Sequence, residues 1–391
     1  MTTLRRGAAV GALVLALAVP SAASATAAPL SGSATAEVVR EAAGVRLALP
    51  APTGRYAVGR DTLHLVDGSR PDPWVPSAGA RELMLSLFYP ARPGTGRPAP
   101  YMSTEEARLL LADRVEGGEA LAGTVAATRT AARQDARPAA GRYPLVVLSP
   151  GFTVPRQTLT HLAEELASRG YVVAAVDHAY ETVGTAFPGG RMLTCAACPQ
   201  VEAGGYRAVS DGRAADVSFV LDRLTGRHPA WRYARLIDPS RIGMAGHSIG
   251  GAATAAAMAA DRRVGAGVNL DGSFATPVPG GGLGGRPFLM LGAPRAVPGG
   301  DPSWDAAWQR LDGWKRWLTV DGSGHFTATD LPVLGGRLGM IDPAEPLSGP
   351  RSAEITRAYV GAFFDLHLGG LPQPILDAPT PADPEVRFHR P

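Results

Sequence analysis

The sequence predicts an α/β fold with about eight strands in a mostly parallel sheet and helices on both faces. Two observations carry this prediction. Short, continuous apolar runs bounded by Gly or Pro recur along the chain, as expected of strands buried on both faces of a parallel sheet. Segments with helical periodicity lie between these runs, and this alternation is typical of a sheet that helices cover on both sides.

Strands are expected at eight places along the chain. The first two, 56–66 and 81–89, alternate apolar and polar residues and are expected to pair as a hairpin. The other six are continuous apolar runs at 145–148, 172–176, 241–245, 265–270, 288–291 and 316–320. Helices are expected between them at 159–169, 206–224, 250–260, 304–313 and 353–368. These elements predict one domain over residues 50–370.

Two segments fall outside this alternation. Residues 102–138 are helical in composition and lie between the second and third strands, where they form either a lid over the functional site or a plain surface insertion. Residues 371–391 are rich in proline and are expected to form an irregular tail.

The first residues indicate export from the cell. Two arginines precede an apolar stretch at 7–19, and a Ser/Ala-rich segment follows with small-residue cleavage sites after Ala25 and Ala28. This is the pattern of a secretory signal peptide. The apolar stretch is too short for a transmembrane helix, which needs about 20 residues. We therefore expect a secreted, soluble, monomeric protein from which residues 1–25 have been removed.

The composition excludes several other classes of protein. With 45% hydrophobic residues the chain can bury a core, which a disordered chain cannot. The formal net charge is only +3, and no basic run or aromatic stripe accompanies it. A nucleic-acid partner is therefore disfavoured.

The two cysteines, Cys195 and Cys198, are expected to form a disulfide that clips a surface loop in an oxidising compartment. Free thiols stay an alternative, as does a redox or metal site. The flanks of a thioredoxin-like motif are missing, however, and a zinc site needs two further ligands.

The nucleophile is expected at Ser248. The segment GHSIGG at 246–251 follows an apolar strand and opens an alanine-rich helix. A serine between glycines at a strand-to-helix turn is the nucleophile elbow of the α/β-hydrolase fold. The glycines remove side chains that would clash with the neighbouring strand and helix, and the positive end of the helix dipole favours the serine. The alternative is a glycine-rich turn with an incidental serine.

The general base and the acid are expected at strand ends further along the chain. His325 directly follows the last apolar run, whereas the two later histidines lie on the last helix and in the tail. Asp271 ends the run 265–270, and Asp301 is the alternative acid. A serine hydroxyl needs an imidazole to accept its proton, and a carboxylate holds that imidazole in the right tautomer. The order serine, aspartate, histidine is the one expected of this fold.

The oxyanion hole is expected to consist of main-chain N–H groups. One donor is the residue after the nucleophile, Ile249. The other comes from the loop after the third strand, where the segment LSPGF at 148–152 makes Phe152 the candidate.

Polar residues near other strand ends are expected to have structural roles. Asp177 and His178 follow the fourth strand and are expected to hydrogen-bond within loops. Asp67, Arg70 and Asp72 are expected to form a turn network far from the chemistry.

Taken together, these motifs resemble the platelet-activating-factor acetylhydrolase-like lipase group of the α/β-hydrolase superfamily. The matching features are GHSIGG, an aspartate 23 residues after the serine, GSGH ending at His325, and the strands at 81–90 and 143–152. The resemblance covers roughly residues 50–370. It implies hydrolysis of short or oxidised acyl chains from glycerophospholipid-type esters, without a metal or another cofactor.

Other motifs are similar to bacterial cutinases and polyester hydrolases, namely LSPGFT at 148–153 and IDPSRIG at 237–243. Those enzymes carry their acid after the next strand, where this chain has Pro294 and Arg295, and they lack an insertion comparable to 102–138. The sequence therefore predicts a secreted serine ester hydrolase. Its expected substrates are short-chain or lipid-type esters, including lipids at a water interface. The alternatives are a polyester hydrolase, a peptidase or acyltransferase with the same residues, and an exported binding protein that has lost the chemistry.

Overall fold

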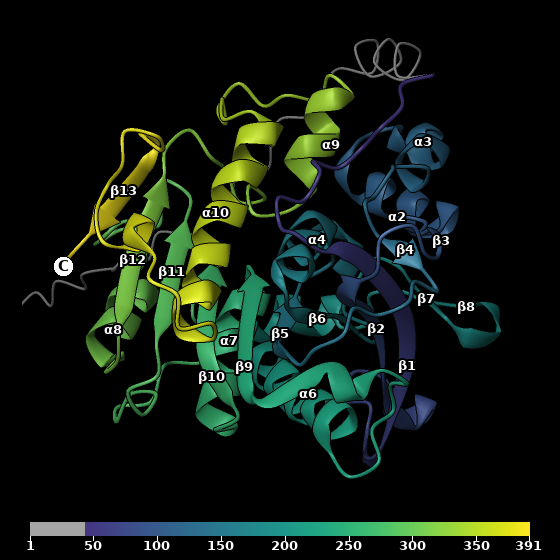
Figure 1. Ribbon diagram of the computed structural model, residues 1–391, viewed down its shortest axis with the longest axis horizontal. Coiled ribbons are helices and arrows are strands. Elements are labelled where there is room, and N and C mark those ends of the chain that lie inside the picture. The colour runs from purple at the N-terminus through teal and green to yellow at the C-terminus, as the bar shows by residue number, and fades with distance from the viewer. Residues whose placement is uncertain (1–43) are drawn as a thin grey trace, which may run out of the picture.

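The structure, a computed structural model that describes residues 44–391, is built around one large sheet (Figure 1). Within the described residues, eleven strands lie in the order β13-β12-β11-β10-β9-β5-β6-β2-β1-β4-β3, and β7 and β8 form a separate pair. The expected signal peptide at 1–25 lies outside the described residues.

The bounds of the elements follow the expected alternation. The strands are β1 (Ala57–Pro71), β2 (Ala80–Ala91), β3 (Arg97–Pro98), β4 (Arg133–Gln134), β5 (Tyr143–Ser149), β6 (Val172–His178), β7 (Thr185–Phe187), β8 (Arg191–Leu193), β9 (Ile237–His247), β10 (Val264–Leu270), β11 (Phe288–Gly292), β12 (Lys315–Val320) and β13 (Val386–His389). The helices are α2 (Thr104–Arg114), α3 (Ala122–Ala126), α4 (Thr160–Arg169), α5 (Cys198–Gly204), α6 (Arg207–Thr225), α7 (Ile249–Ala260), α8 (Pro302–Arg310), α9 (Leu331–Arg337) and α10 (Gly349–His367).

The six continuous apolar runs form the parallel centre of the sheet, from β6 through β5, β9, β10 and β11 to β12. The expected hairpin is also present, because β1 and β2 pair antiparallel from Ala57 opposite Ala91 onward. The strand β2 then joins the parallel centre through antiparallel pairing with β6. The predicted α/β fold with a mostly parallel sheet is therefore confirmed.

Helices cover both faces of the sheet, as predicted. On one face the core contains side chains of α6, α7 and α8, and on the other it contains those of α4 and α10. Figure 1 shows α10 crossing in front of the central strands. Trp304 and Trp317 lie in the first core with exposed fractions of 1% and 0%. These two side chains therefore pack between helix and sheet.

The expectation of an irregular C-terminal tail is wrong for residues 386–389. These residues form β13, which pairs antiparallel with β12 and places Val386 opposite Val320. The burial of Val386 explains the pairing, because only 2% of this residue is exposed. The many prolines of the tail lie outside this four-residue strand and conceal it in the sequence.

The insertion at 102–138 packs against the body of the molecule. Leu110 of α2, Val125 of α3 and Leu121 from the turn between these helices are buried in one cluster. The same cluster contains Val154, which follows β5, and Val333 of α9. The insertion also contributes β4, which lies between β1 and the edge strand β3. It therefore borders the loops at the carboxyl ends of the strands.

Candidate active site

The residues expected to carry the chemistry meet at the carboxyl edge of the parallel strands. Ser248 directly follows β9, Asp271 follows β10, and His325 lies in the loop after β12. Phe152 lies in the loop after β5, which pairs with β9. Ligands of open α/β sheets bind outside this edge.

The backbone at Ser248 has the strained geometry of a sharp strand-to-helix turn. Its φ is 55° and its ψ is −125°, a region that side-chain-bearing residues rarely adopt. The turn also requires small neighbours, because a Cβ atom at Gly250 would lie 2.1 Å from the Ser149 carbonyl oxygen. The turn leads directly into α7, so that the serine lies at the N-terminus of that helix.

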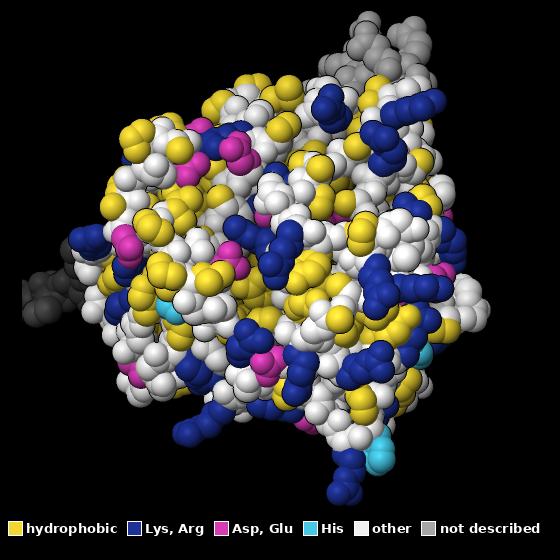
Figure 2. Space-filling model, in the orientation of Figure 1, with side chains coloured by type: hydrophobic (Ala, Val, Ile, Leu, Met, Phe, Trp, Pro, Cys, Tyr) yellow, Lys and Arg dark blue, Asp and Glu magenta, His cyan; other side chains and the backbone are white. Residues whose placement is uncertain are grey.

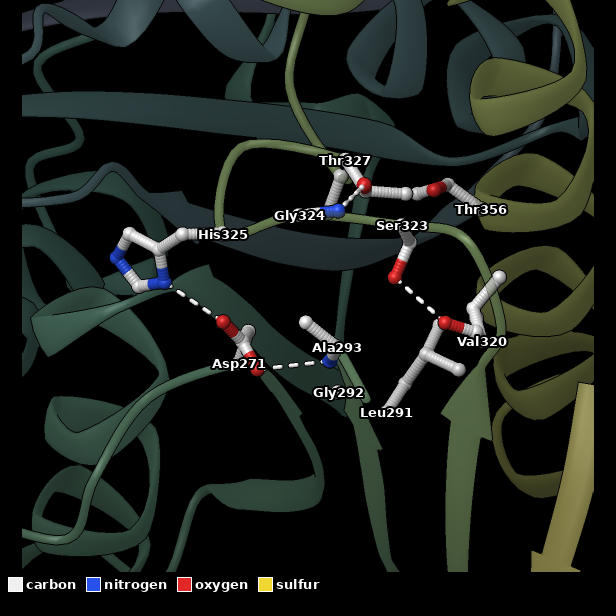
Figure 3. A pocket seen from close by; sticks show the side chains of 11 residues that line it. Asp271, Leu291, Gly292, Ala293, Val320, Ser323, Gly324, His325, Thr327 and Thr356 are labelled. Carbon is white, nitrogen blue, oxygen red and sulfur yellow. Dashed lines mark hydrogen bonds and ion pairs between the residues drawn. The ribbon is translucent and has the colours of Figure 1, made fainter. Parts of the chain in front are cut away.

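The three expected side chains form one chain of hydrogen bonds. Oγ of Ser248 lies 3.0 Å from Nε2 of His325 and donates to it. Nδ1 of His325 lies 2.6 Å from Oδ2 of Asp271 and donates to it. Figure 3 shows Asp271 between the imidazole and the main-chain N–H of Ala293, which donates to Oδ1 over 2.8 Å. The carboxylate is thus held on both oxygens.

Hydrogen bonds within the loop after β10 hold Asp271 in place. Its φ is 57°, so this residue also adopts a left-handed conformation. The side chain of Asn269 closes the turn by donating to the Gly272 carbonyl over 2.7 Å and accepting from the Gly272 N–H over 2.8 Å. Nε1 of Trp304 donates to the same carbonyl.

The alternative acid, Asp301, has a different position. Its side chain caps α8 by accepting from the main-chain N–H of Ser303 over 2.8 Å and from the hydroxyl of the same residue. The carboxylate that accepts from His325 is therefore that of Asp271.

Arg295 adds a positive charge beside the aspartate–histidine pair. Its Nη2 lies 3.6 Å from Oδ2 of Asp271 and 3.2 Å from Nδ1 of His325. Because Nδ1 donates its own proton to the carboxylate, the guanidinium acts on the pair as a nearby charge. The Arg295 side chain is 69% exposed, so solvent weakens this effect.

The two expected oxyanion donors are available. Within residues 44–391, neither the Phe152 N–H nor the Ile249 N–H has a hydrogen-bond partner. The N–H of the first residue in a helix has no partner inside the helix, which frees the group at Ile249. Both residues border an apolar cluster that includes Val201, Val209 and Trp74.

His247 supports the loop that carries the base. It is 1% exposed, and its Nε2 donates to the His325 carbonyl over 2.7 Å. Burial, together with the nearby His325, holds the pKa of His247 well below its usual range. A neutral His247 therefore serves as a fixed hydrogen-bond donor, which agrees with the position of its side chain inside the elbow.

Arg114 borders the site, and sequence reasoning missed it. This residue ends α2, and its guanidinium donates to Oγ1 of Thr153 over 2.6 Å. The same group lies over the ring of Phe326, 4.8 Å from the ring centre. Arg114 therefore connects Thr153, which follows Phe152, to Phe326, which follows His325. Arginines are frequent in this chain, and nothing near Arg114 in the sequence distinguishes it.

Two cavities lie beside the His325 loop. A small one of about 20 Å³ adjoins Asp271 and His325 and is roughly the size of one water molecule (Figure 3). A groove of about 400 Å³ lies between Phe326, α9 and the start of α10. Its walls are mostly apolar, with the carboxylates of Asp342 and Glu345 among the lining groups.

The expected disulfide is confirmed. Cys195 and Cys198 are bonded, and their Cα atoms are 5.4 Å apart. The bond lies at the start of α5, and Cys195 packs against the apolar cluster beside Phe152 and Ile249.

Two features of the described residues concern possible partners. No helix among them is both long enough and apolar enough to cross a membrane. On the face in Figure 2, basic side chains (Lys and Arg, dark blue) are spread over the surface among hydrophobic and acidic ones.

The fold and the nucleophile elbow define an α/β hydrolase. Comparisons with known proteins narrow this class. Residues 43–187 match the family described as "Platelet-activating factor acetylhydrolase, isoform II". A "Probable 1-alkyl-2-acetylglycerophosphocholine esterase" of Arthroderma benhamiae is 29% identical over 371 residues, which cover 87% of this chain and 93% of that protein.

A solved structure gives a stronger match. The ferulic acid esterase from Streptomyces cinnamoneus is 48% identical, with a TM-score of 0.80, over 88% of this chain and 99% of that one. The chain belongs to the same esterase family of the α/β-hydrolase superfamily as this ferulic acid esterase, and over residues 43–187 it is similar to the platelet-activating-factor acetylhydrolases. It is a carboxylic ester hydrolase.

Proposed function

We propose that the protein is a secreted serine ester hydrolase in which Ser248, His325 and Asp271 form the catalytic triad. The observation that carries this proposal is the chain of two hydrogen bonds, 3.0 Å and 2.6 Å long, which joins the three side chains. The hydroxyl of Ser248 has an imidazole that can accept its proton, and the imidazole has a carboxylate that holds its tautomer.

The reaction proceeds through an acyl-enzyme. Oγ of Ser248 attacks the ester carbonyl carbon while Nε2 of His325 accepts its proton. Asp271 stabilises the positive imidazole through the bond to Nδ1. The N–H groups of Phe152 and Ile249 stabilise the negative charge on the carbonyl oxygen. Removal of one such donor typically lowers the rate about 100- to 1000-fold.

The ester bond then breaks, and His325 gives the proton to the departing alcohol. In the second half of the reaction a water molecule loses a proton to His325 and attacks the acyl group. Ser248 leaves with that proton, so the enzyme returns to its starting state.

The proposed substrates are short-chain or lipid-type esters. The apolar cluster beside the oxyanion donors offers a surface for an acyl chain, with the ring of Phe152 edge-on to Tyr206 at 5.5 Å. The groove next to Phe326 offers room for a larger alcohol portion, because 400 Å³ is within the range of small-molecule sites. The name of the Arthroderma relative supports this substrate class.

A second candidate activity is the hydrolysis of aromatic acid esters. The 48% identity to a ferulic acid esterase over nearly the whole of that chain favours it. Both activities use the same triad, and they differ in the acyl group that lies beside Phe152 and Tyr206.

A panel of esters tests the proposal. The panel contains p-nitrophenyl butyrate, a 1-alkyl-2-acetylglycerophosphocholine, methyl ferulate and a polyester film, each with wild type and Ser248→Ala. We expect the variant to lose activity on every ester that the wild type cleaves. Residual activity near the wild-type rate would refute the role of Ser248. The wild-type ranking decides between lipid-type, aromatic and polyester substrates.

Secretion is part of the same proposal. The signal peptide pattern supports it, and so does the disulfide, which is typical of oxidising compartments. Expression of the full chain in a secreting host tests it. We expect a mature protein in the medium that begins at residue 26 or 29, whereas full-length protein retained in the cells would contradict it.

A further inference from the structure

A buried cluster of charged groups lies beside the loop that carries Phe152. The members of this buried charge cluster have exposed fractions of 0–1%: Asp72, Arg81, His178, Glu181, Arg213 and Asp216. Arg70, which is partly exposed, joins the cluster through Asp216 and also pairs with Asp67. The expected turn network is present, because Asp67 accepts from Ser69 and Arg70, and Asp72 also pairs with Arg81 of the cluster.

Arg213 of α6 connects the cluster to the start of the loop. Its Nη1 donates to the Pro150 carbonyl and also to Oγ of Ser149, over 3.1 Å. Its Nε donates to Oε2 of Glu181 over 2.7 Å. Because the guanidinium is a rigid planar group, the bond to Glu181 fixes the direction in which Nη1 points.

Glu181 connects the cluster to the end of the same loop. Its main-chain carbonyl accepts from the Thr153 N–H over 2.9 Å. Its other carboxylate oxygen accepts from Arg81 and from Nε1 of Trp74, each over 2.9 Å. Arg81 in turn bonds to Asp72 over 2.8 Å. The carboxylate therefore has a charged or polar partner on each oxygen.

These contacts fix the two peptide groups on either side of the oxyanion donor. The bond from Arg213 holds the peptide group that contains the Pro150 carbonyl. The bond to Glu181 holds the peptide group that contains the Thr153 N–H. The Phe152 N–H belongs to the peptide group between them, so its direction is set by neighbours that cannot rotate freely.

A second serine–histidine–aspartate arrangement lies within this cluster. Nδ1 of His178 lies 2.7 Å from Oδ2 of Asp216, and its Nε2 lies 3.1 Å from Oγ of Ser149. Burial lowers the pKa of His178, so the neutral ring donates to Asp216 and accepts from the serine. Ser149 is completely buried and is out of reach of a substrate. Its hydroxyl instead braces the end of β5 next to Arg213.

We propose that Arg213 and Glu181 are positioning residues that orient the Phe152 N–H toward the oxyanion. This inference rests on the proposed function, because it concerns the same oxyanion hole. Packing alone does not call for such a cluster, since well-packed apolar residues often replace buried ion pairs without a loss of stability. The contacts of both residues with the loop 149–153 give the cluster a role in catalysis.

The test compares variants at Arg213 and Glu181 with a matched control. The variants are Arg213→Met, Arg213→Lys and Glu181→Gln. The control is Arg70→Met, which alters the same cluster through Asp216 but makes no contact with the loop 149–153. For each, kcat and KM are measured with an ester and with its thionoester, in which sulfur replaces the carbonyl oxygen and accepts hydrogen bonds weakly. Thermal unfolding identifies variants that fail to fold.

We expect Arg213→Met to lower kcat for the ester about 100-fold with KM within about threefold, as for the loss of one oxyanion donor. The thionoester should lose much less, so the ester-to-thionoester rate ratio falls. Glu181→Gln and Arg213→Lys should show the same pattern more weakly, and Arg70→Met should keep the wild-type ratio. If Arg213→Met does not fold, these two milder variants decide the outcome.

Two results would overturn the inference. One is a folded Arg213 or Glu181 variant with a wild-type rate ratio, and the other is an equal loss on both substrates. The Ser248→Ala variant distinguishes failure of the positioning role from failure of the proposed function. An inactive Ser248→Ala beside an unaffected Arg213 series refutes only the positioning role, whereas an active Ser248→Ala refutes the triad itself.

Discussion

The hydroxyl of Ser248 lies 3.0 Å from Nε2 of His325, although 77 positions separate the two residues in the sequence. Parallel strands end at one edge of a sheet, so residues that follow different strands meet there. The strained turn after β9 directs the serine to this edge, and the loop after β12 brings the imidazole to it. The proposed chemistry depends on this contact.

The role of the acid is tested by two isosteric substitutions. Asp271→Asn replaces the carboxylate that accepts from His325 and favours the wrong tautomer of the imidazole. We expect kcat to fall about 10⁴-fold. Asp301→Asn is the control, because asparagine still caps α8, and its kcat should stay within about threefold of wild type. A larger loss for Asp301→Asn would identify that residue as the acid.

The nucleophile elbow is tested by a pair of glycine substitutions. Gly250→Ala places a Cβ atom 2.1 Å from the Ser149 carbonyl oxygen and forces the turn to shift. We expect a loss of about 1–3 kcal/mol in the free energy of unfolding and a marked loss of activity. Gly212→Ala in α6 has nothing within 4 Å of the new atom and should raise the free energy of unfolding by about 0.5–1 kcal/mol. Urea unfolding measures both, and equal effects at the two sites would contradict the account.

Much of this arrangement could be predicted from the sequence because its signals are local. Each of the six apolar runs in the parallel centre is continuous and bounded by turn residues, so its burial is visible without a partner strand. The elbow is a six-residue motif whose neighbours identify it. His325 and Asp271 then follow from their positions at strand ends.

The remaining features depend on contacts between distant residues, which a single sequence does not reveal. The four residues of β13 are recognisable as a strand only beside β12. Arg114 and Arg213 have no distinguishing neighbours in the sequence, and their roles follow from contacts with Thr153 and Pro150. The prediction of a turn network at residues 67–72 did not include the pairs of Asp72 with Arg81 and of Arg70 with Asp216 for the same reason, since these partners lie elsewhere in the chain.

The buried carboxyl group of Glu164 should make the free energy of unfolding depend on pH. Burial raises its pKa from 4.5 to about 7, although the N–H groups of Ala131 and Ala132 donate to the carboxylate. The folded state therefore binds the proton more tightly than the unfolded state. Stability falls as the pH rises from about 4.5 through about 7, by up to about 3 kcal/mol from this group.

Glu164→Gln cannot ionise and should remove this part of the pH dependence. The free energy of unfolding is measured in urea at pH 5 and pH 8 for both proteins. We expect the wild type to lose more stability between these pH values than the variant does. The amide keeps one acceptor oxygen, so the variant should lose about 1 kcal/mol at pH 5. Parallel losses in the two proteins would show that Glu164 does not titrate in this range.

The contacts of Arg114 beside the active site predict that the insertion at 102–138 contributes to catalysis. Its guanidinium bonds to Thr153 and covers the ring of Phe326, so Arg114→Ala should loosen both sides of the site. We expect kcat/KM to fall about 10-fold, as for the loss of one hydrogen bond to a charged group. Arg108→Ala removes an exposed arginine of the same helix that pairs with Glu105 and should have no effect. Equal kcat/KM values for the two variants would contradict a role for Arg114.

Covalent labelling of the intact enzyme tests whether Ser248 is a nucleophile that His325 activates. An organophosphonate ester reacts readily with a serine only when an adjacent general base activates it, and here that base is the imidazole of His325. We expect one adduct per chain, which peptide mass spectrometry maps to Ser248, and no adduct in Ser248→Ala or His325→Ala. An adduct on another residue, or an unlabelled enzyme that still hydrolyses esters, would contradict it.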